Sequence, residues 1–166
     1  MKKNGILGAT TVFELGTAED IDLFFDAVWV ILEKGGRGSR FPVVMNRFYK
    51  YALRIDEIKQ AKQEMDIIKS EMAKISVKKW SQFSNGINLD DTSWNKKSSN
   101  LAELFESVFR GFDTAYNMTI FLIEKYDDFV PMKIGRCDIP YTLEDSMRPP
   151  EEYDKLGEDD LPFWKR

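Results

Sequence analysis

The sequence predicts an α+β fold in which a small, mainly antiparallel sheet is covered by three amphipathic helices. Strand-like segments are short and few, whereas three longer segments repeat apolar residues at helical spacing. The chain has 166 residues and is 43% hydrophobic and 31% charged, which suits a globular domain with a sizeable core. We expect a single α+β domain over residues 1–143 and an acidic, proline-rich C-terminal extension over residues 144–166.

The first strand is expected at residues 9–15, because ATTVFEL is rich in β-branched residues. After this strand, Thr17 stands three residues before Asp20. This spacing resembles a capping box in which Asp takes the place of the usual Glu. The helix that starts there is expected to run to Lys34 and to stop at the Gly-Gly pair that follows. Its apolar side recurs at helical intervals through Ile21, Phe24, Phe25, Val28, Ile31 and Leu32.

The next segments are expected to be a short helix, an extended piece and a long helix. Pro42 suits the first position of the short helix, residues 53–55 are expected to be extended, and Asp56 is expected to cap a helix over residues 57–75. One narrow apolar seam runs along that long helix, which is typical of a helix lying on a sheet. The seam consists of Ile58, Ala61, Met65, Ile68, Met72 and Ile75.

The C-terminal half begins with a polar and irregular segment. Residues 78–100 carry few apolar side chains, and one strand is expected near residues 79–83. Residues 101–105 fit either a strand or a helix. A helix is expected over residues 107–126, followed by a strand over residues 129–136 whose proline places it at an edge or a bulge.

The composition excludes several common catalytic designs. The chain has no histidine, so it can hold no Ser-His-Asp triad, no Cys-His pair and no imidazole metal ligand. Cys137 is the single cysteine, which excludes an internal disulfide and a CxxC metal site, and we expect it to be a structural thiol. Adjacent acidic residues in polar loops lack the burial that acid–base or metal chemistry needs. We therefore expect no enzyme activity, no catalytic residue, no metal and no cofactor.

The glycine-rich loop at residues 35–40, GGRGSR, has the composition of a phosphate cradle. It lacks the Lys-Ser/Thr ending of a P-loop and does not lie between a strand and a helix N-terminus. We expect it to be a helix stop followed by a connection.

All of the net charge lies near the C-terminus. Residues 1–143 carry 20 acidic and 20 basic side chains, whereas residues 144–166 carry 8 acidic and 4 basic ones. The sequence pI near 5.0 argues against nucleic acid as a partner, since a nucleic-acid binder needs excess Lys and Arg. The longest apolar run, residues 27–32, is far shorter than the roughly 20 residues that span a bilayer. We expect no membrane partner and a cytoplasmic location.

Acidic side chains next to aromatic ones suit contact with a basic protein surface. Two arrangements stay open for the tryptophans: the rings anchor a partner, or they pin an irregular segment and the end of the chain onto the protein's own domain. The predicted partner-binding residues are Asp90, Asp91, Trp94, Glu151, Glu152, Asp159, Asp160 and Trp164.

Three segments resemble a known family. Residues 41–50 (FPVVMNRFYK), residues 61–68 (AKQEMDII) and residues 100–105 (NLAELF), the last leading into a helix and a closing strand, resemble the immunity protein 70 family. This family comes from bacterial polymorphic-toxin and contact-dependent inhibition systems. The resemblance covers residues 11–134 and implies a small cytoplasmic α+β protein that binds and neutralises a cognate toxin, often a nuclease. It transfers no toxin-contacting residue to this chain.

The leading hypothesis is a non-enzymatic immunity protein that blocks a basic toxin domain, a nuclease, by one-to-one binding. One alternative is a histidine-free hydrolase or transferase that uses carboxylates, whose mark would be two carboxyl groups converging in a deep pocket with a perturbed pKa. The other alternative is an adaptor subunit that buries its aromatic residues in an obligate assembly.

Overall fold

A three-stranded antiparallel sheet forms one part of the fold. The computed structural model describes residues 2–9, 11–80, 88–95, 97–137 and 161–165. Its strand order is β2-β1-β3, so the central strand pairs with both of its neighbours. The strands are β1 (Asn4–Gly8), β2 (Thr11–Gly16) and β3 (Lys133–Arg136).

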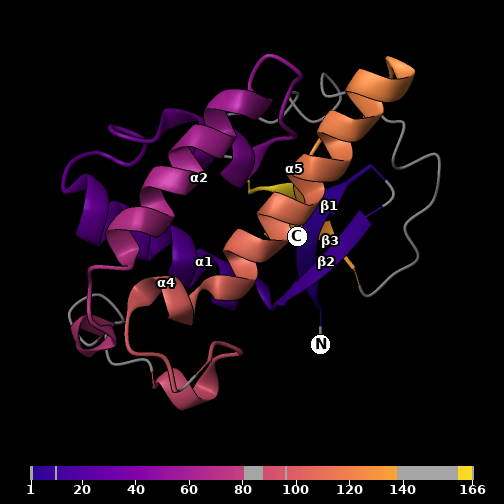
Figure 1. Cartoon of the computed structure of the whole chain (residues 1–166). Helices are drawn as coiled ribbons and strands as arrows, with labels where there is room; N and C mark the ends of the chain where they lie inside the picture. Colours follow the sequence, from indigo (N-terminus) through magenta and orange to yellow (C-terminus); the bar gives the residue numbers. More distant parts are fainter. Residues whose placement is uncertain (1, 10, 81–87, 96, 138–160, 166) are drawn as a thin grey trace.

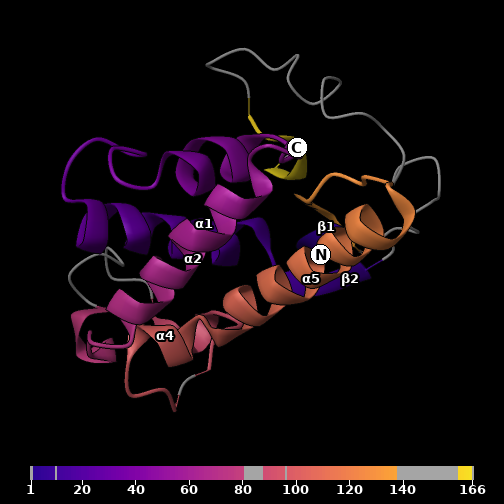
Figure 2. The same cartoon turned by 45° about the horizontal axis from the view of Figure 1, so that its top comes forward.

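The helices complete the predicted α+β class. One long helix crosses a face of the sheet, and the other three lie together to one side of it (Figures 1 and 2). The crossing helix is α5 (Glu106–Tyr126), and the others are α1 (Ala18–Ala27), α2 (Ile58–Met72) and α4 (Leu101–Leu104).

β1 is a strand that the sequence analysis missed. It is buried at all five positions and forms the centre of the sheet. The strand expected at residues 9–15 is confirmed as β2, and the last part of the strand expected at residues 129–136 is confirmed as β3, which lies at an edge of the sheet. The sequence of β1, NGILG, contains two glycines, which weaken the strand signal. A Cβ atom on Gly8 would lie 2.8 Å from the Cβ of Ala115, so this glycine lets α5 approach the sheet closely.

The start of α1 confirms the predicted capping box. The Thr17 backbone N–H donates to Asp20 Oδ2 at 3.0 Å, and the Asp20 N–H donates to Thr17 Oγ1 at 3.3 Å. The helix continues as a π-helical segment, η1 (Val28–Glu33), and ends at Lys34, as predicted. Lys34 itself adopts the left-handed conformation, with φ of 58°, so the stop precedes the glycines.

The segments between η1 and α2 follow the prediction in part. A helix does begin after Pro42, but it is the π-helical η2 (Val43–Phe48). The expected cap at Asp56 is wrong, because α2 begins after Glu57 and that residue makes no side-chain cap bond. Glu57 Oε1 instead accepts from the Arg54 N–H at 2.8 Å.

The predictions for the C-terminal half are confirmed in part. The strand expected near residues 79–83 does not begin at residue 79, because that residue ends a 3-10 turn. Residues 81–87 lie outside the described residues. The helix expected at residues 107–126 is confirmed as α5. The 3-10 turns are η3 (Val77–Lys79), η4 (Leu89–Asp91) and η5 (Phe163–Lys165).

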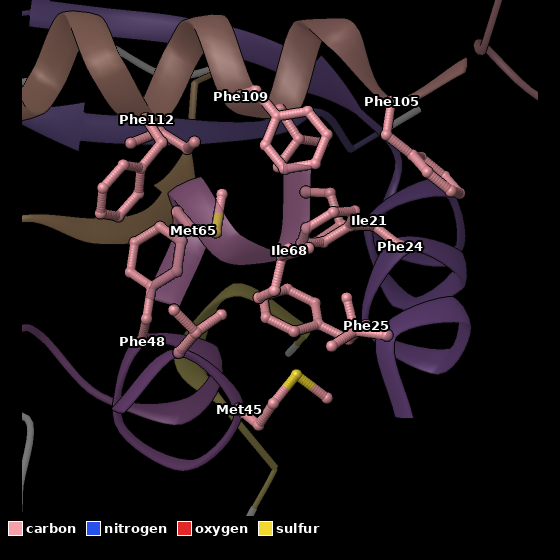
Figure 3. Close-up of a cluster of buried hydrophobic side chains, with 14 of the residues drawn as sticks. Ile21, Phe24, Phe25, Met45, Phe48, Met65, Ile68, Phe105, Phe109 and Phe112 are labelled. Carbon is pink, nitrogen blue, oxygen red and sulfur yellow. The ribbon is translucent and has the colours of Figure 1, made fainter. Parts of the chain in front are cut away.

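Interlocked aromatic rings fill the core between the helices (Figure 3). Phe24 of α1 meets Phe105 and Phe109 edge to face at 5.4 and 5.7 Å, and Phe48 of η2 meets Phe112 of α5 at 5.3 Å. Such pairs add directional attraction to the burial of apolar area. The core therefore fixes α1, η2 and α5 relative to one another.

The end of the chain returns to the domain (Figure 2). Trp164 Nε1 donates to the Tyr49 carbonyl at 2.7 Å, and Lys165 Nζ lies 2.5 Å from Asp22 Oδ2. Burial alone would lower the pKa of Lys165, but bonds to Asp22 and Tyr49 outweigh this and raise it. Trp164 and Lys165 thus hold the end of the chain against α1 and the residue that follows η2. No helix among the described residues is long and apolar enough to cross a bilayer.

Candidate partner-binding site

An open hollow of about 730 Å³ lies where β2 turns into α1. Its wall is built from the start of β1, the end of β2, the first turn of α1, the residues around the end of η4, and η5. Asp91 and Trp164, two of the predicted partner-binding residues, both belong to this wall although they are far apart in the sequence.

The carboxylate of Asp20 holds two sides of the hollow together. It is buried, with 7% exposure, and accepts from Thr17 on its own helix as described above. It also accepts from the Ser93 N–H at 3.3 Å and from Ser93 Oγ at 2.7 Å. These bonds fix the first turn of α1 against the segment that follows η4.

Gly16 makes this junction possible. Its φ is +144°, a conformation that L side chains rarely adopt. A Cβ atom there would lie 2.5 Å from Ser93 Oγ and 2.6 Å from Asp20 Oδ2. Any larger residue would therefore push apart the two groups that hold the hollow together.

The charged groups of the wall divide into paired and unpaired ones. Lys3 Nζ lies 2.8 Å from Glu14 Oε1, and this bond raises the pKa of Lys3. Lys165 is bound to Asp22 and Lys2 also has an interaction, so the basic wall residues are engaged. The exposed carboxylates of Glu19 and Asp91 have no hydrogen-bond or ion-pair partner within the described residues.

Asn4 adds an unusual feature to the wall. Its side chain is completely buried, yet neither the amide nitrogen nor the amide oxygen has a hydrogen-bond partner in the described part of the chain. Buried amides are nearly always hydrogen-bonded, because an unpaired one loses its water bonds without compensation.

The other predicted site residues are distributed as follows. Asp90 and Asp91 are exposed on η4, whereas Trp94 and Trp164 are each only 3% exposed and pack in the protein's own core. Their burial agrees with the packing alternative, and a role as partner anchors stays a prediction. The predicted contacts of the acidic extension lie outside the described residues: Glu151, Glu152, Asp159 and Asp160.

The glycine-rich loop at residues 35–40 is occupied by a side chain of the protein itself. Glu33 Oε1 accepts from the Gly38 N–H, and Glu33 Oε2 accepts from the N–H groups of Arg40 and Phe41, each at 3.0 Å. A carboxylate thus takes the place that an external anion would need. The predicted role as a connection agrees with this geometry.

Two carboxyl groups with a raised pKa, the half-buried Asp26 and the buried Glu64, lie away from the hollow. Burial raises the pKa of Asp26, which lies 3.8 Å from Arg37 Nη1. Burial likewise raises the pKa of Glu64, although the Val44 and Val43 N–H groups donate to it at 2.7 and 3.2 Å. Both carboxyls serve local structure, and no group of three potential metal-binding side chains was found in the described ranges.

Comparison with known proteins identifies the family. A family model described as Immunity protein 70 matches residues 7–115, which run from β1 into α5. The chain belongs to the immunity protein 70 family. The resemblance to this family is thereby confirmed, and membership of an immunity protein family implies a cognate toxin as partner. No curated protein and no solved structure matches the chain.

The family match covers only part of the hollow. The walls from Glu14 to Asp20 and from Asp91 to Ser93 lie within the matched residues. The start of β1 and η5, which also line the hollow, lie outside the matched residues. In this immunity protein, the hollow therefore combines matched segments with the two ends of the chain.

Proposed function

We propose that this immunity protein neutralises a basic bacterial toxin domain, a nuclease delivered by contact-dependent inhibition or a related polymorphic-toxin system, by binding it one to one and covering its active site. Membership of the immunity protein 70 family carries the proposal. The protein works in the cytoplasm and converts no substrate itself.

The charge distribution supports a basic partner. The net charge of −4 arises from residues 144–166, and Asp90 and Asp91 present exposed carboxylates on η4. A nuclease that grips phosphate is basic around its active site, so acidic groups steer the inhibitor to that surface. The proposed contacts are Asp90, Asp91, Trp94, Glu151, Glu152, Asp159, Asp160 and Trp164.

Co-expression tests the function directly. Cells that express the toxin domain encoded next to this protein's gene should grow only when the immunity protein is also expressed. Rescue by the wild-type protein together with a stable purified complex is the expected result. Continued growth arrest despite well-folded immunity protein would contradict the proposal.

Charge reversal tests the acidic contacts. Replacing Asp159 and Asp160 by Lys should slow association with the purified toxin domain and weaken its dependence on salt. The matched control is the double change Glu106→Lys and Glu124→Lys on α5, which alters the net charge equally. Equal association rates for both double variants would remove the acidic extension from the interface.

A further inference from the structure

One edge of the sheet is open. β2 pairs with β1 on one side only, and no hydrogen bond from the rest of the described residues reaches its backbone between Thr11 and Glu14. The opposite edge is engaged, because the Met132 carbonyl next to β3 accepts from the Leu53 N–H at 2.8 Å. Val12 is 41% exposed and Glu14 is exposed as well, so this part of β2 is accessible from outside.

The hairpin of β1 and β2 fixes which backbone groups point out of the sheet. Two residues connect the strands, so Thr11 at the start of β2 exchanges backbone bonds with β1. Such positions alternate along an antiparallel pair, so Phe13 also bonds to β1; a Cβ atom on Gly5 would lie only 2.2 Å from the Phe13 carbonyl oxygen, which therefore faces β1. The N–H and C=O groups of Val12 and Glu14 consequently point away from the sheet.

The charges around this edge are balanced. Glu14 Oε1 lies 2.8 Å from Lys3 Nζ. The Arg110 guanidinium lies over the Phe13 ring at 5.5 Å and is paired with Glu106 at 3.4 Å. A second, identical edge is therefore not repelled by its own charge. A basic protein gains little here, because attraction over a distance needs an excess of negative charge.

We infer that β2 pairs with β2 of a second copy of this chain, antiparallel and about a two-fold axis at Phe13, so that two three-stranded sheets become one. In this register Val12 of one copy lies opposite Glu14 of the other, and each such pair exchanges its outward backbone bonds. Like charges are not opposed, as they would be if the axis passed through Glu14. The two-fold symmetry closes the assembly at a dimer. The inference does not rest on the proposed function, because it concerns the contact between two copies of the immunity protein.

Side chains on the α5 face of the edge fit the same register. The half-buried Phe13 would lie directly opposite Phe13 of the second copy, at a position where side chains of paired strands approach closely. Arg110 lies over Phe13, so the side of α5 that carries Arg110 faces this edge. Ser107 and Thr114 share that side by their helical spacing. Both are small, so the α5 helices of the two copies can run next to each other on the joined sheet.

Analytical ultracentrifugation of the purified full chain tests the pairing. The wild type should sediment as a 19.3 kDa monomer when dilute and approach twice that mass at about 1 mM, since a short edge gives a weak interface. Val12→Pro removes an outward N–H but no bond to β1, so it should stay monomeric at the same concentration. Val12→Ala keeps the N–H and is the matched control, which should dimerise like the wild type.

A pair of charge changes tests the register. Val12→Glu places like charges opposite Glu14 of the other copy and should raise the dimer Kd about tenfold, whereas Val12→Lys places opposite charges there and should not raise it. These two variants decide the matter even if circular dichroism shows that Val12→Pro fails to fold. Hydrogen exchange measured by NMR gives a second readout, in which the Val12 and Glu14 amides should exchange about tenfold more slowly in the dimer than in the dilute monomer.

A wild type that stays at 19.3 kDa up to about 1 mM would overturn the inference. So would a dimer that forms equally well in Val12→Pro, or equal dimer Kd values for Val12→Glu and Val12→Lys. Protection of the Val12 and Glu14 amides only after the toxin domain is added to a monomeric protein would assign this edge to the toxin and would also overturn it. None of these results bears on growth rescue, so the proposed function is tested separately.

Discussion

Asp20 offers the sharpest test of how the hollow is built. In Asp20→Ala the bonds that the carboxylate accepts from Thr17 N–H and Oγ1 are lost, and so are those from Ser93 N–H and Ser93 Oγ at 3.3 and 2.7 Å, whereas the backbone N–H of residue 20 still donates to Thr17 Oγ1. Loss of the Thr17 bonds costs about 1 kcal/mol, and a short bond to a carboxylate contributes about 1.5 kcal/mol. With the longer Ser93 bond included, the free energy of unfolding should fall by about 3 kcal/mol.

Urea denaturation followed by circular dichroism measures this change. At an m-value of about 2 kcal/mol/M, the unfolding midpoint should fall by about 1.5 M. Glu19→Ala is the matched control, because Glu19 is adjacent and acidic but has no partner among the described residues, and it should cost no more than about 0.5 kcal/mol. Equal and small effects of the two changes would refute the view that Asp20 joins α1 to the η4 segment.

Three further predictions concern single positions. Gly16→Ala should lower the free energy of unfolding by about 2 kcal/mol because of the φ of +144° at this position. The control Gly36→Ala, which has open space around it, should not lower the free energy of unfolding. Equal urea midpoints for the two variants would contradict this prediction. Trp164→Ala should cost about 3 kcal/mol in thermal or urea unfolding if the chain end is docked as described, and an unchanged midpoint would contradict that docking. Burial raises the pKa of Glu64, so its ionisation weakens folding. The stability of the wild type relative to Glu64→Gln should therefore decline as the pH rises above the ordinary glutamate value, and a difference that grows with pH would contradict this.

The parts of the fold that depend on local sequence were predictable. The helical spacing of apolar residues located α2 and α5, and the Thr17–Asp20 spacing located the start of α1. Local patterns failed where tertiary packing decides the structure. β1 lacks a strong strand signal and exists because two strands and α5 surround it.

The hollow could be predicted only in part. Asp91 was visible as an exposed acidic residue, but no local pattern indicates that Asp20 will bond to Ser93 or that Asn4 will be buried without a partner. The same holds for Trp164, whose contact with Tyr49 joins residues far apart in the chain. Burial of the tryptophans in the protein's own core is likewise a tertiary property.

The central claim is that this protein neutralises its toxin by binding and not by catalysis. The most direct test measures the residual activity of the purified toxin domain while the immunity protein is added in known amounts. Activity should decline in proportion to the added protein and vanish at one equivalent. Loss of toxin activity at far less than one equivalent, or full activity at an excess, would contradict the claim.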